Sequence, residues 1–532
     1  MQPQTERATH PPSVAALLHI GNDLMARGEV AEAIAAYRSL TTRAPQCSPA
    51  YRNLALALEQ RGEIGEALSA CGRAIELEGD DLEAYLIMAR LLLKLERMEQ
   101  AVAMYELAAL AAPARADIHA SLGAALARQG RLEEASAACE RAIALAPQDV
   151  GAWLNLGIIK SKRGDLAGAV EAYRQAISID PNSPEAFTNL GAALGSLGMS
   201  AAAIAASARA VELRPGDAEL HYNHAMLLLR SGDLKAGFRE FEWRLSHASP
   251  KFRPRSFDVP RWRGEPRQGR TLLIHAEQGL GDSLHFVRFV AQAAATGGAV
   301  VLQVQPPLVE LLRDSLDVTV ISRDAPAPPF DLHVPLMSLP FELGITMETI
   351  PSQVPYLKAA PAKAAAWRAK LAGYEGLKVG VVWAGSPGHR HDRMRSLSAE
   401  LVLPHLAMPG VQLFSLQKEP RADDRLVLEG SSSGIVDLAP SLASFADTAA
   451  AVSAMDLVIS VDTAVAHLAG ALGKPTWILL PHVLDWRWLY AREDTPWYPT
   501  ARLFRQTRCG DWASVLDRLP SELERFAAGR AD

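Results

Sequence analysis

The second half of the chain contains loops whose residue types could handle a phosphorylated ligand. The first is Glu277–Asp282, in which Gly279 and Gly281 would let the backbone pass close to a ligand. Asp282 then places a carboxylate at the positively polarised start of a helix. Such an aspartate is suited to act on a bound substrate, although capping of the helix accounts for the same pattern without any ligand.

A second loop, Ser460–His467, combines an acid, a hydroxyl and an imidazole where a buried strand enters a helix of small residues. Asp462 and Thr463 stand at this entry, so free backbone N–H groups and the Thr463 hydroxyl are available to a diphosphate. His467 follows about one turn later and could reach the same phosphates. We interpret this loop as a diphosphate site, and the alternative is again helix capping.

A third loop, Ser386–Ser396, carries three arginines and two histidines, and Arg395 is one of the arginines. Guanidinium groups that face a cleft would neutralise phosphate charge. The alternative is a solvated basic loop at the surface. A fourth segment, Asp485–Trp488, is expected either to close over a bound donor or to pack its two tryptophans in the core.

These loops follow apolar runs that predict the strands of parallel sheets. The predicted strands cover residues 271–275, 300–305, 318–322 and 331–336, then 377–385, 411–416, 456–461 and 476–481, with helical patterns between them. Strands that alternate with helices indicate right-handed crossovers, and ligands of such sheets lie beyond the carboxyl ends of the strands. We therefore predict two Rossmann-like halves, 271–360 and 377–532, joined by a bridge at 361–376 and separated by a cleft.

The first half of the chain repeats itself every 34 residues. Glycine recurs at this spacing, with Glu96 in the one gap, at Gly28, Gly62, Gly130, Gly164, Gly198 and Gly232. Each glycine relieves the turn between two amphipathic helices, and a small residue five positions later lets the two helices approach closely. The period predicts an α-solenoid of helix pairs, in seven units over residues 14–251, between a flexible tail at 1–13 and a linker at 252–270.

Asparagine recurs at one position of the repeat, on the first helix of its unit. The four residues are Asn53, Asn155, Asn189 and Asn223. In a solenoid this helix lines the concave surface, and amide side chains can hold the backbone of an extended peptide without reading its sequence. The alternative is that these asparagines form hydrogen bonds between neighbouring helices.

Composition and charge restrict the class of protein further. Hydrophobic residues make up 49% of the 532 residues and the net charge is −6, so neither nucleic acid nor an anionic membrane is an expected partner. The chain has no apolar run of about 18 residues, no secretory h-region at its start and only four scattered cysteines. We therefore expect a multidomain cytoplasmic protein without an integral membrane segment.

Two families resemble parts of this sequence. The 34-residue unit resembles the tetratricopeptide repeat, while GDSLH and VDTAVAHLAGALGKPTWIL resemble the heptosyltransferase-like glycosyltransferases of family nine, which have the GT-B fold. The second resemblance implies a nucleotide-sugar donor substrate and no cofactor, and it assigns the catalytic base to Asp282. The donor-binding residues that we infer are Gly279, Gly281, Arg395, Asp462, Thr463 and His467.

The sequence departs from that family at two points. Ala464 stands where the family has a glycine, which narrows the approach of the backbone to the phosphates. The half at 271–360 is short for a domain that recognises an acceptor. A family glutamate that binds the donor ribose would fall within Gln417–Glu419. Repeats followed by a GT-B domain are also similar in layout to protein O-GlcNAc transferase, which implies a protein acceptor held by the repeats.

The expected function is an inverting transfer of a sugar from a nucleotide sugar to an acceptor, a protein in the leading hypothesis. Because the chain contains no D-x-D pair, a metal-bound diphosphate is not indicated, and we expect a metal-independent enzyme. Two alternatives stay open. One is transfer to a lipid-linked or polysaccharide acceptor, with the repeats recruiting an assembly partner. The other is a non-catalytic scaffold with a degenerate sugar-nucleotide domain.

Overall fold

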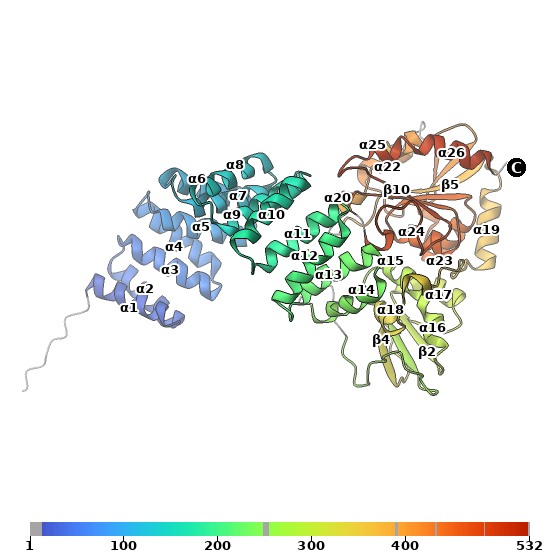
Figure 1. Cartoon of the computed structure of the whole chain (residues 1–532), viewed down its shortest axis with the longest axis horizontal. Coiled ribbons are helices and arrows are strands. Elements are labelled where there is room, and N and C mark those ends of the chain that lie inside the picture. Colours follow the sequence, from blue (N-terminus) through green and yellow to red (C-terminus); the bar gives the residue numbers. More distant parts are fainter. Residues whose placement is uncertain (1–12, 248–254, 389–391, 431–433, 484, 530–532) are drawn as a thin grey trace, which may run out of the picture. The chain divides into compact units, whose positions relative to one another are not determined.

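Figure 1 shows the computed structural model of the chain, which describes residues 13–247, 255–388, 392–430, 434–483 and 485–529. The chain divides into two compact units, Met1–Ala193 and Leu194–Asp532. The helical repeats fill the first unit and continue into the second, which also contains two parallel sheets. The predicted order of an α-solenoid followed by an α/β region is confirmed.

Fourteen helices form the repeats within the described residues. They are α1 (Val14–Ala26), α2 (Val30–Arg43), α3 (Ser48–Arg61), α4 (Ile64–Leu77), α5 (Leu82–Lys94), α6 (Met98–Ala111), α7 (Ala116–Gln129), α8 (Leu132–Leu145), α9 (Val150–Lys162), α10 (Leu166–Ile179), α11 (Pro184–Ser196), α12 (Ser200–Leu213), α13 (Ala218–Ser231) and α14 (Leu234–Phe241). A short 3₁₀ helix, η1 (Glu242–Ser246), extends the last of them.

The turns predicted from the 34-residue period have the backbone conformation that favours glycine. The six glycines of the series have φ between 75° and 94°, and Glu96, which fills the gap, has φ 58°.

Within the repeats, neighbouring helices pack closely where a glycine leaves space for a large side chain. A Cβ on Gly157 would lie 2.4 Å from the Cε1 of Tyr173, and a Cβ on Gly123 would lie 2.4 Å from the Sγ of Cys139. The buried ring and the buried thiol therefore fill equivalent spaces left by the glycines.

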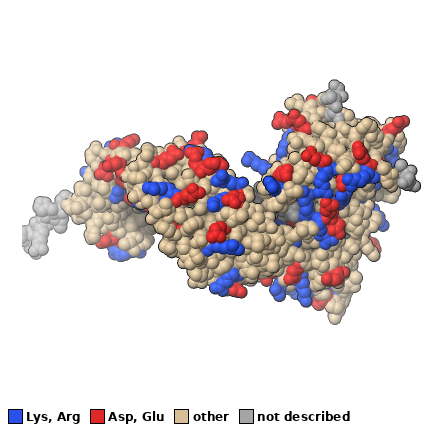
Figure 2. All heavy atoms as spheres, turned by 45° about the horizontal axis from the view of Figure 1, so that its top comes forward, with Lys and Arg blue, Asp and Glu red and all other residues tan. Residues whose placement is uncertain are grey.

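Acidic and basic side chains are interspersed over the face of the molecule that Figure 2 shows. In the repeats many of them form exposed pairs, such as Arg38 with Glu66 and Arg115 with Asp117. Exposed pairs of this kind contribute at most about 1 kcal/mol each to stability. The repeats are therefore held together by their apolar and small residues rather than by these charges.

The first sheet has four parallel strands in the order β3-β2-β1-β4. Its strands are β1 (Leu272–His275), β2 (Val300–Val304), β3 (Thr319–Ser322) and β4 (Leu332–Pro335), with the helices α15 (Leu280–Phe286), α16 (Val290–Ala294), α17 (Val309–Ser315) and α18 (Leu339–Glu342). β1 and β2 are buried along their whole length, which explains their continuous apolar sequences. All four strands lie where the sequence predicts them.

The second sheet has six parallel strands in the order β10-β9-β8-β5-β6-β7. They are β5 (Leu377–Val382), β6 (Val411–Ser415), β7 (Ile435–Asp437), β8 (Leu457–Val461), β9 (Thr476–Leu480) and β10 (Ala501–Arg505). The helices are α19 (Pro361–Leu371), which precedes β5, then α20 (Asp392–Arg395), α21 (Ala399–Val402), α22 (Ala422–Glu429), α23 (Phe445–Ser453), α24 (Ala464–Ala471), α25 (Ala513–Leu516) and α26 (Leu519–Ala528). Two Rossmann-like sheets in tandem are consistent with the GT-B fold.

The last repeat helices share a hydrophobic core with the first sheet. Leu229 of α13 and Phe238 of α14 belong to the same buried cluster as Ile274 of β1 and Trp486, which follows β9. Burial of such side chains contributes about 1.5–3 kcal/mol each. Because one core contains all of these residues, the ends of the repeats and the loops at the strand ends hold one another in place.

Candidate functional site

The first two loops predicted to carry chemistry come together in the structure. α15 follows β1 and α24 follows β8, and these two helices pack against each other. A Cβ on Gly281 would lie 3.1 Å from the Cδ2 of His467 and 3.4 Å from the Cα of Ala464. The missing side chain of Gly281 therefore allows direct contact between the loop that bears Asp282 and the start of α24.

Asp282 is the third residue of α15 and is held at both of its oxygens. The backbone N–H of Gly279 donates to Oδ2 at 2.9 Å, which is the helix-capping contact of the alternative interpretation. The guanidinium of Arg487 donates to Oδ1 at 2.6 Å. The side chain is still 24% exposed, so this carboxylate remains accessible to a ligand.

Arg487 is a residue of this site that the sequence analysis did not identify. It is buried between two carboxylates, and it also donates to the Oδ1 of Asp485 at 2.9 Å. Burial acts to lower its pKa, but the charges of Asp485 and Asp282 outweigh that effect and raise the pKa. The flanking Trp486 and Trp488 are buried, so core packing is the correct interpretation of this pair. The signal that could have revealed Arg487 is an arginine between two core tryptophans, where a cation needs an acidic partner.

The loop from Glu277 to Asp282 is held at its other end by a second buried arginine. Arg244, in η1, donates to both carboxylate oxygens of Glu277, at 3.2 and 2.9 Å, and to Glu242 at 2.7 Å. Its side chain is fully buried. A bidentate pair of this kind fixes both position and orientation. The first glycine loop is thus fixed at its first residue by Arg244 and at its last residue by Arg487.

Asp462 directly follows β8, before α24, and contacts the third loop. Its backbone carbonyl accepts a hydrogen bond of 2.6 Å from Arg395. Burial, followed by the negative charge of nearby Asp485, raises the pKa of Asp462 to about 6. The Nε of Arg395 lies 3.5 Å from Asp392. The predicted convergence of the second and third loops therefore occurs at Arg395, whereas His389, Arg390 and His391 lie outside the described residues.

Thr463 and His467 are buried and have partners within the protein. The Thr463 hydroxyl lies 3.0 Å from the hydroxyl of Ser460, and it does not cap α24. The Nδ1 of His467 lies 2.9 Å from the hydroxyl of Tyr498, which is also 3.1 Å from the Nδ1 of His285. Burial, aided by the positive charge of Arg487, lowers the pKa of His467 to about 3. At neutral pH this ring can form hydrogen bonds but carries no charge.

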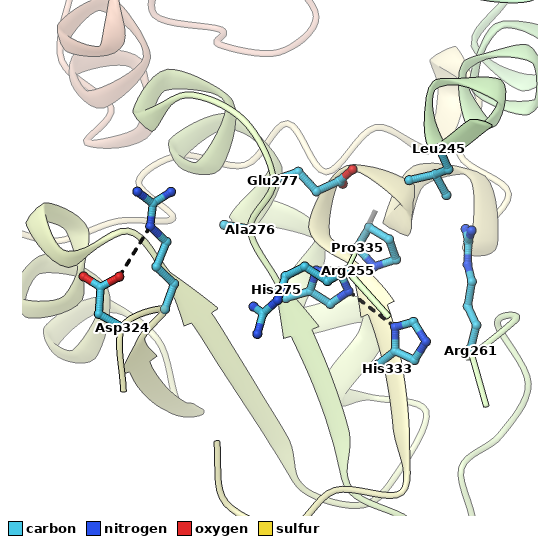
Figure 3. A pocket seen from close by; sticks show the side chains of 10 residues that line it. Leu245, Arg255, Arg261, His275, Ala276, Glu277, Asp324, His333 and Pro335 are labelled. Carbon is cyan, nitrogen blue, oxygen red and sulfur yellow. Dashed lines mark hydrogen bonds and ion pairs between the residues drawn. The ribbon is translucent and has the colours of Figure 1, made fainter. Parts of the chain in front are cut away.

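A cavity of about 500 Å³ lies at the carboxyl edge of the first sheet (Figure 3). Its lining includes His275 at the end of β1, Pro335 at the end of β4 and Arg323 just after β3. Arg255 and Arg261, which precede β1, complete its basic lining. This cavity begins beside Glu277, the first residue of the loop that ends at Asp282.

Two histidines form the floor of this cavity. The Nε2 of His275 lies 3.4 Å from the Nδ1 of His333, as the dashed line in Figure 3 marks. The Nδ1 of His275 has no hydrogen-bond partner in the part of the chain that the structure describes. Burial lowers the pKa of His275 to about 3 and also lowers the pKa of His333. The pair is therefore neutral and can exchange hydrogen bonds with an uncharged hydroxyl group.

The four asparagines of the repeats differ in their contacts. Asn53 donates to the side chain of Asn22 at 2.8 Å, and Asn155 donates to the carbonyl of Ala120 at 3.4 Å. These two contacts are the helix–helix hydrogen bonds of the alternative interpretation. Within the described residues, no hydrogen bond is recorded for the amides of Asn189 and Asn223. Any peptide contact is thus best available at the last two positions.

Within the residues that the structure describes, no group of three or more histidine, cysteine, aspartate or glutamate residues is arranged to hold a metal ion. Across the same ranges, none of the helices has the length and apolar character needed to span a bilayer. Gln417, near which a ribose-binding residue was expected, accepts a hydrogen bond from the backbone N–H of Ala384 at 3.1 Å.

Comparison with known families matches both parts of the chain. Residues 402–479 match glycosyltransferase family 9 (heptosyltransferase), a segment that includes Asp462, Thr463 and His467. Tetratricopeptide-repeat families match residues 18–81, 58–126, 116–159, 159–198 and 184–217. Both resemblances noted in the sequence are thereby confirmed.

Individual proteins are similar to parts of the chain. Protein FlbA of Caulobacter vibrioides is 31% identical over 338 residues, which cover 58% of this chain and 56% of that protein, so the chain spans about half the length of this curated relative. The structure of YrrB, a TPR protein with an unusual peptide-binding site, is 23% identical over 34% of this chain and 92% of that one, with a TM-score of 0.30. TTC0263 of Thermus thermophilus is 26% identical over 34% of this chain and 100% of that one, also with a TM-score of 0.30. Taken with the family matches, the chain carries tetratricopeptide repeats followed by a glycosyltransferase family 9 (heptosyltransferase) domain.

Proposed function

We propose that the α/β region transfers a sugar, with inversion, from a nucleotide sugar to a protein acceptor that the repeats recruit. The observation that carries the proposal is the contact between two loops at the strand ends. One loop presents Asp282, and the other presents Asp462 and Thr463 at the start of α24. The family 9 match covers the second of these loops.

The donor diphosphate would bind at the start of α24. The first N–H groups of a helix attract anions, and Thr463 is the residue that directly precedes α24. Arg395 donates to the carbonyl of Asp462 through Nη1 and its Nε faces Asp392, so its Nη2 is the group left for a phosphate. His467 would contribute a neutral hydrogen bond rather than a positive charge, because burial lowers its pKa to about 3. Charge stabilisation of the leaving nucleotide then rests on Arg395 and the helix.

Asp282 would act as the general base. It would take the proton of the acceptor hydroxyl as the oxygen attacks the anomeric carbon, and the bond from that carbon to the diphosphate would break. The electron pair of that bond leaves with the nucleotide. Arg487 and the N–H of Gly279 orient the carboxylate, which retains further lone pairs for the acceptor proton.

The acceptor side of the reaction would use the cavity at the edge of the first sheet. This cavity adjoins the loop that carries Asp282, and its floor offers the neutral pair of His275 and His333. The repeats would hold the rest of a protein acceptor, with Asn189 and Asn223 as the amides available to its backbone. The donor sugar and the acceptor protein are to be identified by experiment.

The direct test is to incubate the full chain with nucleotide sugars that differ in base and sugar, in the presence of a chelator. We expect release of the nucleotide from one of them and transfer to protein. Thr463→Ala with Arg395→Ala should weaken nucleotide binding by several kcal/mol, because charge-assisted phosphate contacts contribute about 1.5–3 kcal/mol each. Unchanged binding in this double variant would remove the donor assignment. Binding without any turnover would favour the scaffold, and transfer to saccharide alone would favour the polysaccharide enzyme.

A further inference from the structure

A second cavity lies where the end of α11 and α13 meet the loops after β9 and β10. It has a volume of about 280 Å³. The lining residues that decide its chemistry are Gly195, Arg230, His482, Tyr490, Arg505 and Gln506. Among the described residues that line it, none is acidic. Neither Asp282 nor Thr463 is part of this lining, so the cavity is separate from the proposed reaction site.

The two guanidinium groups of this cavity have no carboxylate partner within the ranges that the structure describes. Arg230 has its Nη1 3.5 Å from the Tyr490 hydroxyl, and its guanidinium lies 5.6 Å from the centre of that ring. Arg505 donates only to backbone carbonyls of the segment 488–492. Burial lowers the pKa of Arg505 to about 10. Two partly buried cations without an anion make the cavity unfavourable when it is empty.

Two residues that line this cavity each have a buried N–H donor without an acceptor in the described part of the protein. They are the Nε of Arg230 and the Nε2 of Gln506. Gln506 is 5% exposed, and its Oε1 accepts from the backbone N–H groups of His482 and Gly510, both at 3.1 Å. An unpaired buried donor costs about 1–3 kcal/mol. Both side chains therefore keep unused donor capacity beside the cavity.

Tyr490, which supplies the hydroxyl group of this cavity, lies in a segment with a strained backbone, Leu489–Ala491. Leu489 and Ala491 have φ of 54° and 47°, a region that residues with a side chain rarely adopt. Hydrogen bonds from Arg505 to carbonyls of this loop hold the conformation. A Cβ on Gly195 would lie 3.0 Å from the Tyr490 hydroxyl. The strain thus places that hydroxyl between α11 and Arg230.

We propose that this cavity binds the carboxylate of an acidic side chain in a polypeptide that lies along α13. The donors around it match the two oxygens of a carboxylate. Arg230 comes seven residues after Asn223 on α13, so both residues lie on the same face of the helix. The amide of Asn223 is available to the backbone of the polypeptide, while Arg230 binds its acidic side chain. The choice of a polypeptide rests on the proposed function of the repeats, whereas the anion site does not.

The test compares two fluorescent decapeptides, one of glutamate and one of glutamine, binding to the full chain at low salt. The wild type should bind the glutamate peptide at least about tenfold more tightly. Arg230→Gln should abolish this preference, and Arg230→Lys should retain part of it because the charge is kept. Arg239→Gln is the matched control, since it removes an arginine that is 67% exposed on the neighbouring helix α14. Tryptophan fluorescence confirms that each variant is folded.

Four outcomes separate the possibilities. Loss of the preference in Arg230→Gln alone supports the site, and an unchanged preference in that variant overturns it. If inorganic phosphate binds in a manner that depends on Arg230 while neither peptide binds, the occupant is a free anion and the polypeptide is wrong. Equal binding of both peptides to the wild type also overturns the site. Turnover of nucleotide sugars by the wild type is measured in parallel, so failure of the transferase proposal is distinguishable from failure of this one.

Discussion

The two compact units differ in whether the arginines of their ion pairs are buried. In Met1–Ala193 most ion pairs lie at the surface, and the side chains of Arg38 and Glu66 are 48% and 63% exposed. Where the acidic partner is buried, as in Arg52 with Asp81, the arginine is still 27% exposed. In Leu194–Asp532 the side chains of Arg244 and Arg487 are 0% and 6% exposed. Both buried arginines contact the same loop, one through Glu277 at its start and the other through Asp282 at its end.

This difference in the burial of paired arginines indicates where the chain holds charges in fixed positions. The repeats are stabilised by small and apolar residues at a constant period, so their surface charges are free to vary. A buried cation costs several kcal/mol unless it is well paired, so it is expected only where its partners must be held. The loop between β1 and α15 is such a place, and the comparison predicts that chemistry depends on the buried charges while recruitment depends on the repeats.

The largest expected effect distinguishes sugar transfer from the binding of an acceptor to the repeats. Asp282→Asn should reduce sugar transfer by about 10²–10⁴-fold, because an amide cannot accept the proton of the acceptor. Binding of a protein acceptor to the repeats should be unchanged. Transfer is measured with a labelled nucleotide sugar, and Asp314→Asn, at an exposed aspartate of the same half, is the control. A variant with the wild-type rate would mean that another group, such as Glu277 or His275, is the base.

A second prediction compares a buried arginine with an exposed one. Arg487→Met leaves Asp282 and Asp485 without their cation and should lower the free energy of unfolding by about 3–5 kcal/mol. Arg38→Met removes only the pairs of an exposed arginine with Glu63 and Glu66 and should cost about 1 kcal/mol or less. Urea unfolding followed by circular dichroism and tryptophan fluorescence measures both variants. Equal losses in the two variants would break the contrast between the units.

The fold was predictable from the sequence to a large extent because its signals are local. The 34-residue period located the helix turns, including the turn at Glu96, where the structure has a positive φ. Continuous apolar runs located eight of the strands. β7 and β10 were missed because β7 has only three residues and because Arg502 and Arg505 interrupt the apolar pattern of β10.

The candidate site was predictable only in part because its remaining members are joined by tertiary contacts. Asp282, Thr463 and His467 stand in motifs, and the structure brings their loops together. Arg487 and Tyr498 do not stand in motifs. They reach the site from 205 and 31 residues away along the chain. The neutrality of His467 also follows from burial, which the sequence of its loop does not reveal.

The third prediction concerns the repeats. Asn189→Ala with Asn223→Ala should weaken a protein acceptor by about 2–4 kcal/mol, because each amide can exchange two hydrogen bonds of about 1 kcal/mol with a peptide. Hydrolysis of the donor should be unchanged. Asn53→Ala is the matched control, since its amide already donates to Asn22. Transfer to protein at the wild-type rate in the double variant would mean that these asparagines only pack the repeats.

The smallest expected effect tests whether burial governs the acid at the start of α24. The folded protein raises the pKa of Asp462 from 3.8 to about 6. Between these values the folded state holds a proton that the unfolded state has lost, so the free energy of unfolding falls as the pH rises through this window. Asp462→Asn cannot ionise. The stability of the variant relative to the wild type should therefore increase from pH 4 to pH 7, by roughly 1–3 kcal/mol.

Urea unfolding at several pH values measures this difference, and tryptophan fluorescence is a suitable signal because nine of the ten tryptophans lie in Leu194–Asp532. Asp314→Asn, at an exposed position, is the control for the loss of an aspartate elsewhere in the α/β region. A difference for Asp462→Asn that does not change with pH would mean that this carboxylate is ionised throughout the range. In that case the positive charges of Arg395 and Arg487 outweigh the effect of burial on the pKa of Asp462. A fully ionised Asp462 would then repel a diphosphate at neutral pH more strongly than a partly protonated one. The pH dependence therefore decides which charge a donor would meet at this helix.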